Sequence, residues 1–220
     1  MLRIDLYNEH LNPKDMIIIE SKRKKPATIL KKYPNAVLAD VTSGAKDGLV
    51  KLSPFYPHGD IPVPYSDGFT ATCVEAIWQG LKVFEDADVD VQMFQNDTMK
   101  NIKRTVRRFG KPLGHRKGVN GTELLGYIEA RKLIYIPTYR WVLENKAANI
   151  IERLREASKT KTIVLLDYDT NSDVENPKKP LSHASLIKAY AEGIYPYDDV
   201  EASNNDTTKE SVLQLDLFNQ

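Results

Sequence analysis

Residues 162–171 read TIVLLDYDTN and contain the clearest strand signal in the chain. Four apolar residues, Ile163 to Leu166, follow one another without a polar break, and acids and an asparagine come directly after them. A short apolar run bounded by turn-forming residues is typical of a strand that is buried on both faces. The stretch therefore predicts a buried strand that carries acidic side chains at its carboxyl end.

Helices are predicted on both sides of this strand. The stretch 121–136 leads to Pro137, which suits the first turn of a helix over residues 138–157. After the strand, Ser182 is a typical N-cap for a last helix that Gly193 closes. Helices should therefore dominate this half of the chain.

The amino-terminal part mixes short strands with a helix. Residues 16–20 and 36–41 are apolar and extended in character, and Pro26 suits the first position of a helix between them. Repeated prolines and glycines then disfavour regular structure over residues 52–68. A long loop of this kind within a compact domain is often functional.

The composition favours one compact domain. With 220 residues, of which 41% are hydrophobic and 28% charged, the chain can bury one substantial core. We expect an α+β fold, a single mostly helical domain with a small sheet over residues 1–197, and then a disordered acidic C-terminal tail over 198–220. The single cysteine, Cys73, and the four scattered histidines predict a reducing compartment and a fold without metal. No segment reads as a membrane helix or a signal peptide, so we predict a cytoplasmic location.

The formal net charge of +1 hides an uneven distribution. Residues 22–32 carry six basic side chains and residues 100–117 carry eight, with no acid in either segment. Such segments favour a polyanionic partner such as phosphate or nucleic acid. A helix predicted over residues 99–109 gives the same pattern if its basic side only faces solvent. The residues expected to contact a DNA backbone are Lys100, Lys103, Arg104, Arg107, Arg108, Lys111 and Lys117.

Residues 72–84 predict an amphipathic helix with two stripes. Thr72 and Glu75 have the spacing of a capping box. The apolar face comprises Val74, Ile77, Trp78, Leu81 and Phe84. Glu75, Gln79 and Lys82 form a second stripe, in which a carboxylate beside an amide and an ammonium can hold a sugar or phosphate and act on water. The structural alternative is that Glu75 only closes the capping box while Lys82 lies in solvent.

The acids after the predicted strand form a second candidate site. They are Asp167, Asp169, Asn171 and Asp173. Their spacing opens a calcium loop, but the glycine and the glutamate that complete such a loop are missing, so we exclude calcium. An acidic active site and a polar turn that ends the strand both remain possible. The histidines in loop or cap settings, where a structural role is the commoner one, are His58, His115 and His183.

Residues 51–84 resemble the front half of the NADAR (YbiA-like) family. The matching positions are Leu52, Ser53, Phe55, Tyr56, Pro57, Val74, Glu75, Gln79 and Lys82. Pro54 and Ala76 replace an asparagine and a histidine of the family pattern. The closing signatures of the family are missing, and residues 167–190 stand in their place. The chain is thus similar to a divergent branch of that family, with the NADAR-like domain over residues 1–197.

The resemblance implies an N-glycosidase that needs no cofactor. Family members cleave N-glycosidic bonds, removing ADP-ribose from modified bases or hydrolysing ribosylated intermediates. The resemblance implies Glu75 as the main carboxylate, with Asp169 or Asp167 as the second acid. The residues expected to bind the base and the phosphates are Phe55, Tyr56, His58, Gln79, Lys82, His115, Arg116, Asn171 and His183.

The end of the tail resembles the peptide by which bacterial polymerases and repair proteins bind the sliding clamp. The five matching residues are Gln214, Leu215, Asp216, Leu217 and Phe218. The polar residues before them would act as a flexible tether. The alternative is that these apolar residues dock on the core of the chain's own domain.

Three functions are compatible with these patterns. The first is an N-glycosidase that removes an ADP-ribosylated or otherwise modified base from DNA, recruited by the clamp, in a bacterial cell or a phage-infected host. The second is a small-molecule N-glycosidase of nucleotide metabolism, in which the basic segments bind only substrate phosphate. The third is a clamp-binding adaptor or inhibitor without enzymatic activity. The sequence leaves the oligomeric state open.

Overall fold

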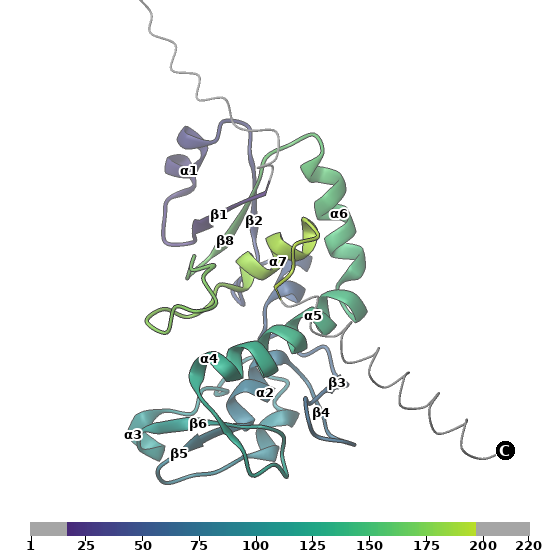
Figure 1. The fold of residues 1–220 in the computed structure, drawn as a ribbon. Helices are drawn as coiled ribbons and strands as arrows, with labels where there is room; N and C mark the ends of the chain where they lie inside the picture. Colours follow the sequence, from purple (N-terminus) through teal and green to yellow (C-terminus); the bar gives the residue numbers. More distant parts are fainter. Residues whose placement is uncertain (1–16, 197–220) are drawn as a thin grey trace, which may run out of the picture.

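The structure of the protein is a computed structural model that describes residues 17–196 (Figure 1). The fold is α+β, as predicted, with helices distributed around small sheets. No helix in this part of the chain is long and apolar enough to cross a membrane. The predicted tail over residues 198–220 lies outside the described residues.

The main sheet has three parallel strands in the order β1-β8-β2. They are β1 (Ile17–Ser21), β2 (Val37–Asp40) and β8 (Ile163–Asp167), so all three predicted strands are confirmed. The central strand β8 pairs on both sides, and every one of its residues is buried. This is the environment that its continuous apolar run predicts.

Helices cover both faces of this sheet (Figure 1). On one face lies α1 (Pro26–Lys32), whose Ile29 packs against Val164. On the other face lie α6 (Ala148–Ser158) and α7 (His183–Ala191), which contact each other and the sheet. A parallel sheet must be covered in this way because both of its faces are apolar.

The rest of the domain is built around α2 (Val74–Gly80) and α5 (Ile136–Asn145), which pack on each other. Two small antiparallel sheets flank them. One pairs β3 (Ile61–Pro62) with β4 (Thr70–Ala71), and the other contains β5 (Lys82–Phe84), β6 (Pro112–Arg116) and β7 (Leu124–Leu125). One apolar core runs from Ile17 of the parallel sheet to Ile77 of α2, so the two regions share a single core.

Short helical turns complete the fold. They are η1 (Gly48–Leu52), η2 (Val91–Gln95), α3 (Val106–Phe109), α4 (Tyr127–Ala130) and the π-helical segment η3 (Arg131–Tyr135). Pro137 lies in the first turn of α5, as predicted. Because proline has no N–H to offer the carbonyl of Leu133, it favours the wider π-helical turn that comes directly before it.

The N-terminus of α2 differs from the predicted capping box. The N-cap is Cys73, whose Sγ accepts a hydrogen bond from the backbone N–H of Ala76. The hydroxyl of Thr72 instead donates to the carbonyl of Asn96 over 2.6 Å. The capping role considered for Glu75 is therefore wrong, and its carboxylate is available for other contacts.

The C-terminus of α2 comes earlier than predicted. The helix was expected to continue to residue 84, but it ends at Gly80, and Lys82 already belongs to strand β5. A Cβ on Gly80 would lie 2.3 Å from the ring of Phe94. The close approach of these two segments requires a glycine, and the chain leaves the helix there.

Two further helix predictions are corrected. Of the predicted helix over residues 99–109 only the last turn is helical, because Met99 and Asn101 have positive φ angles of 58° and 55°. The predicted helix over residues 138–157 is divided by a break at Lys146 into α5 and α6. Both predicted helices are therefore longer than the helices that the structure contains there.

Candidate active site

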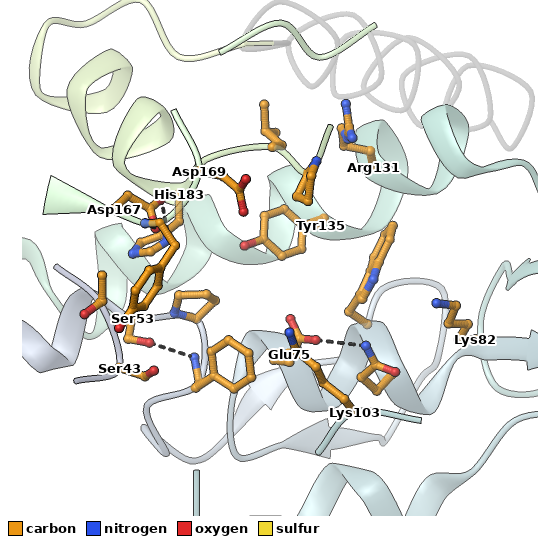
Figure 2. Close-up of a pocket in the computed structure, with 18 of the residues that line it drawn as sticks. Ser43, Ser53, Glu75, Lys82, Lys103, Arg131, Tyr135, Asp167, Asp169 and His183 are labelled. Carbon is orange, nitrogen blue, oxygen red and sulfur yellow. Dashed lines mark hydrogen bonds and ion pairs between the residues drawn. The ribbon is translucent and has the colours of Figure 1, made fainter. Parts of the chain in front are cut away.

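A cavity of about 670 Å³ opens where the carboxyl ends of the parallel strands face α2 (Figure 2). The strand ends contribute Arg23, Thr42, Ser43, Asp167 and Asp169, and α2 with the start of β5 contributes Glu75, Trp78, Gln79 and Lys82. Ligands of open α/β sheets bind beyond the carboxyl ends of the strands. The cavity brings together the two regions that the sequence marked separately, the stripe on α2 and the acids after β8.

Glu75 is the carboxylate that α2 presents to the cavity, and its residue is only 8% exposed. Its Oε1 accepts a hydrogen bond of 2.9 Å from Nε2 of Gln79. Burial raises the pKa of the Glu75 carboxyl, while the bond from Gln79 and the ammonium groups of Lys103 and Lys82 oppose the rise. A buried carboxyl with a raised pKa is a stronger base than an exposed one, as general acid–base catalysts require.

The side chain of Gln79 is oriented by the backbone of the next segment. Its Oε1 accepts a hydrogen bond of 3.0 Å from the backbone N–H of Arg104. The amide nitrogen must then point toward Glu75, because the oxygen already has its donor. The carboxylate is thus held by a fixed donor and not by a mobile side chain.

Arg104 is a structural residue rather than an exposed one. It was expected on the solvent-facing side of a basic helix, but it is only 7% exposed. Its guanidinium donates to the carbonyls of Gln79, Lys82 and Asp88. These bonds fix the segment that carries Lys103 against the end of α2. The expected surface position of Arg104 is therefore wrong.

Two ammonium groups make the α2 side of the cavity positive. Lys82 is half-buried, and burial lowers its pKa while the nearby Glu75 carboxylate opposes that effect. Lys103, which was expected to contact DNA, also lines the cavity, with Nζ 5.9 Å from the centre of the Phe55 ring. Paired ammonium groups beside an apolar ring are suited to a phosphate attached to an organic group.

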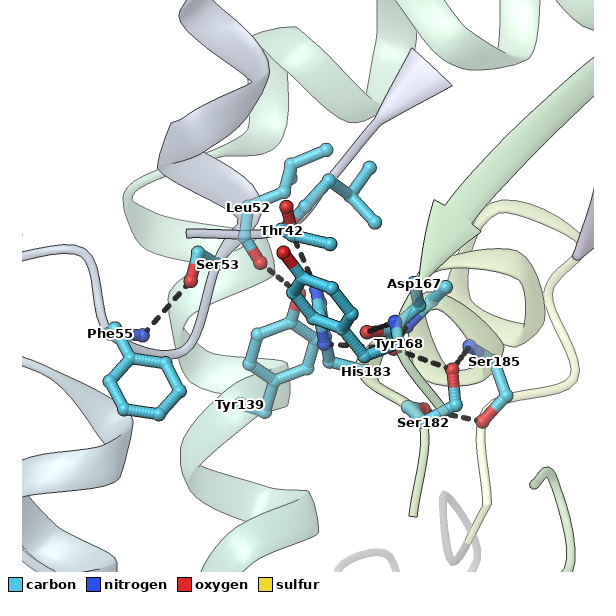
Figure 3. Close-up of polar contacts among 12 residues, drawn as sticks. Thr42, Leu52, Ser53, Phe55, Tyr139, Asp167, Tyr168, Ser182, His183 and Ser185 are labelled. Carbon is cyan, nitrogen blue, oxygen red and sulfur yellow. Dashed lines mark hydrogen bonds and ion pairs between the residues drawn. The ribbon is translucent and has the colours of Figure 1, made fainter. Parts of the chain in front are cut away.

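Asp167 is fully committed to contacts within the fold (Figure 3). Its Oδ2 accepts bonds from Ser182 Oγ at 2.7 Å and from the Ala184 N–H at 3.4 Å, and lies 3.0 Å from Nδ1 of His183. Its Oδ1 accepts from the backbone N–H of Tyr168 at 2.7 Å. Burial alone would raise the pKa of Asp167, but the bonds from His183 and Ser182 hold it below its ordinary value. These contacts favour a structural role.

His183 joins two strand ends. Its Nε2 lies 2.8 Å from the carbonyl of Val41, which follows β2, while Nδ1 faces Asp167 at the end of β8. Ser182 is the N-cap of α7, as predicted. His183 lines the cavity, but both of its ring nitrogens already have partners. The contacts of His183 with Val41 and Asp167 therefore position the strand ends that form one wall of the cavity.

Asp169 is the acid on the sheet side of the cavity whose carboxylate is available to a ligand. Its half-exposed carboxylate lines the cavity and makes no hydrogen bond or ion pair with the residues that the structure describes. In Figure 2 Asp169 and Glu75 approach the cavity from different elements. Of the two acids that the sequence left as alternatives, Asp169 is the one available to a ligand.

Aromatic side chains that sequence reasoning did not assign to the site form much of the wall. Trp78, which the periodicity gave to the core face of α2, lines the cavity together with Tyr127 and Tyr135. The Trp78 ring meets the Tyr135 ring edge to face at 5.7 Å and 79°. Apolar rings next to fixed polar groups are typical of small-molecule sites. No pattern in the sequence marks Tyr135.

Five of the expected substrate-binding residues do not line the cavity. They are Tyr56, His58, His115, Arg116 and Asn171. His58 lies against Tyr56 and its Nε2 is 2.8 Å from the carbonyl of Lys51. Asn171 donates to the carbonyl of Asp173 and shapes the loop there. Their expected places at the site are corrected.

His115 lies behind the wall of the cavity. It is 2% exposed, and its ring lies 3.8 Å from that of Trp78. Burial, together with the charge of Lys82, lowers the pKa of His115 to about 3. The neighbouring Arg116 forms an ion pair with Asp88 at 2.8 Å. His115 thus supports Trp78 as a neutral ring.

The basic segment is only partly available to a partner. The exposed cations are Lys100, Lys103, Arg107, Arg108 and Lys111. Lys117 pairs with Glu123 at 2.9 Å, and Arg104 is buried. Because Lys103 and Val106 line the cavity, the exposed cations begin at its mouth.

The fold and the site together define an α+β protein with a polar, aromatic-lined ligand cavity at the carboxyl edge of a parallel sheet. No group of three or more metal-ligating side chains occurs in residues 17–196. Residues 21–187 match DUF6939, a family of unknown function, and the chain belongs to this family. Comparison with curated proteins and with solved structures gave no match. The NADAR resemblance stays a prediction, and the clamp-binding residues 214–218 lie outside the described residues.

Proposed function

We propose that the protein is an N-glycosidase that hydrolyses the bond between a sugar and a base in a phosphorylated ribosyl adduct or modified nucleotide. The observation that carries this proposal is the buried Glu75 carboxylate, oriented by Gln79 and facing a cavity that also holds Asp169. Two carboxylates on different walls of one site are the arrangement that glycoside hydrolysis uses.

The chemistry assigned to Glu75 is activation of water. The C1–N bond breaks with its electron pair on the leaving nitrogen, and the sugar becomes an oxocarbenium-like cation. Water adds to C1 and gives a proton to Glu75, whose raised pKa suits a general base. The proton then passes to the leaving base, so the products are a free sugar hydroxyl and a neutral base. Asp169 stabilises the cation electrostatically.

The remaining wall residues suit the rest of such a substrate. Lys82 and Lys103 can hold phosphate next to Glu75, since both line the cavity and reduce the pKa rise of that carboxyl. Trp78 offers a ring, backed by His115, on which a base can stack. The exposed cations at the mouth are compatible with a substrate that continues as a nucleic-acid strand.

The test is a substrate panel followed by mass spectrometry. Wild-type protein and Glu75→Gln are incubated with plain, ADP-ribosylated and hypermodified oligonucleotides and with free ADP-ribosylated nucleosides. We expect release of a base or of ADP-ribose that Glu75→Gln reduces by about 10²-fold to 10⁴-fold. Glu152→Gln, on α6 and paired with the nearby Arg155, is the matched control.

Each outcome distinguishes the candidate functions. Release from oligonucleotides supports a DNA-directed enzyme, and release only from free nucleosides supports a small-molecule enzyme. Full activity of Glu75→Gln, or no release from any substrate, contradicts the proposal. No release from any substrate favours the clamp-binding adaptor. In that case, changing Leu217 and Phe218 to alanine should abolish binding to a bacterial sliding clamp.

A further inference from the structure

Tyr135 is the residue of the cavity that neither the stripe on α2 nor the acids after β8 includes. It ends the π-helical segment η3, and in Figure 2 its ring stands between the elements that carry Glu75 and Asp169. Its hydroxyl makes no hydrogen bond with the residues that the structure describes. π-Helical turns are rare and are frequent at functional sites.

Other tyrosine hydroxyls of the core have protein partners. Tyr33 donates to Glu20, Tyr139 donates to the carbonyl of Leu52, and Tyr195 donates to that of Ile136. Buried hydroxyl groups normally have such partners because a lost hydrogen bond is costly. Tyr135 is instead only partly buried and its side chain lines the cavity, so the partner of its hydroxyl there is water or a ligand.

Packing holds the ring of Tyr135 without help from its hydroxyl. The ring meets Trp78 edge to face at 5.7 Å and lies nearly parallel to Tyr139, with centroids 6.3 Å apart. Burial and the charges of Glu75 and Asp167 raise its pKa well above the ordinary value. The group is thus a fixed donor that keeps its proton and lies within electrostatic reach of Glu75.

We propose that the hydroxyl of Tyr135 donates a hydrogen bond to the 2-hydroxyl oxygen of the substrate sugar, whose own proton is directed to Asp169. The proposal rests on the N-glycosidase function. If Glu75 serves C1, the sugar hydroxyl nearest to that carbon is the one on C2, and a hydroxyl can accept from one group while it donates to another. The site would then select a ribosyl over a 2-deoxyribosyl N-glycoside. On DNA it would therefore favour the bond between an attached ADP-ribose and its base over the bond between a base and its own deoxyribose.

The predicted selectivity follows from the cost of leaving the site unsatisfied. A 2-deoxyribosyl substrate offers no partner to Tyr135 or to Asp169, and buried polar groups without partners reduce binding strongly. Hydrogen bonds to the 2-hydroxyl also strengthen in the transition state of glycoside hydrolysis. The selectivity should therefore appear mainly in kcat/KM.

The experiment compares two sugars in two proteins. Wild type and Tyr135→Phe, which keeps the ring contacts, are assayed on matched ribosyl and 2-deoxyribosyl nucleosides carrying the same leaving base. The different intrinsic reactivity of the sugars cancels when the ratio of kcat/KM values is compared between proteins. We expect Tyr135→Phe to reduce the ribosyl preference by about 10-fold to 100-fold. Tyr65→Phe, an exposed tyrosine outside the cavity, should leave the ratio unchanged.

A binding measurement separates this proposal from the proposed function. Calorimetric titration with ADP-ribose and with its 2-deoxy analogue needs no turnover, and wild type should prefer ADP-ribose more strongly than Tyr135→Phe does. If neither substrate is hydrolysed but this difference in binding appears, the enzymatic function fails and the role of Tyr135 stands. If both sugars respond equally to Tyr135→Phe in turnover and in binding, the hydroxyl does not read the 2-position and the inference is overturned.

Discussion

Nε2 of Gln79 lies 2.9 Å from Oε1 of Glu75, and the same amide accepts a bond from the backbone N–H of Arg104. This chain of bonds fixes the carboxylate to a segment that is distant in the sequence. The packing of the Arg104 guanidinium against the Phe84 and Phe109 rings, 5.0 Å and 4.9 Å from their centres, holds that segment in place. The geometry of the proposed base thus depends on residues that do not touch the substrate.

Replacement of Gln79 by leucine should separate orientation from folding. The variant removes the donor to Glu75 and leaves the backbone N–H of Arg104 without its acceptor, which costs about 1–3 kcal/mol of stability. We expect a folded protein whose hydrolytic kcat falls by about 10-fold to 100-fold, since a misoriented base loses part of its effect. Urea unfolding gives the first quantity and the substrate panel gives the second. An unchanged kcat would show that Gln79 does not orient the carboxylate.

The stability of the protein should depend on the ionisation of Glu75. Burial raises the pKa of Glu75 in the folded protein above its ordinary value of 4.5. Above pH 4.5 the unfolded carboxyl has lost its proton while the folded one retains it, so the folded state binds more protons. Stability then falls as the pH rises, by up to about 1.4 kcal/mol per pH unit, until the folded pKa is passed.

The comparison with Glu75→Gln isolates this effect. Other titrating groups such as Asp167 are present in both proteins, so their contributions cancel in the difference between the two unfolding free energies. We expect the wild type to lose stability relative to Glu75→Gln over this pH window, and hydrolysis by the wild type to rise over the same window. A difference that does not change with pH would contradict a raised pKa.

Much of the fold follows from local patterns in the sequence. The apolar run of β8 and the shorter runs near residues 16–20 and 36–41 predict three strands, and all three are present. Their order could not be predicted, because β1 and β2 do not pair with each other but each pairs with β8, which follows them by more than half of the chain. Pairing over such a distance leaves no periodic signal.

The site was predictable where side chains lie on one element and not where several elements meet. Glu75, Gln79 and Lys82 were found from helical spacing, although Lys82 belongs to β5 because α2 ends at Gly80. Asp167 and Asp169 differ in role because Asp167 contacts the start of α7. The spacing of acids in the sequence does not predict where α7 lies. The same limit applies to every residue that tertiary packing alone brings to the cavity.

Asp167 and Asp169, at the carboxyl end of β8, should respond differently to replacement by asparagine. Asp167→Asn keeps only one of the two oxygens that accept from Ser182 and from the Tyr168 N–H, and it removes the charge that faces His183; breaking a buried charge contact costs about 3 kcal/mol. Asp169→Asn breaks no hydrogen bond or ion pair within residues 17–196, so it should leave the unfolding free energy within about 0.5 kcal/mol of wild type while it reduces hydrolysis. Chemical unfolding and turnover of both variants make the test. Equal losses of stability would mean that Asp169 is also structural.

The basic segment gives a matched pair of tests for DNA binding. Arg107 and Arg108 are exposed, whereas the neighbouring Arg104 donates to three carbonyls. Changing both exposed arginines to alanine should leave stability intact and weaken oligonucleotide binding. The slope of log K against log salt should become less steep by about 0.7–0.9 for each phosphate that the variant no longer neutralises.

Arg104→Ala should instead destabilise the fold by about 1–3 kcal/mol, because the three carbonyls lose their donor. If the double variant binds DNA with unchanged affinity and salt dependence, the exposed cations serve only solubility, and the small-molecule enzyme becomes the better account of the cavity.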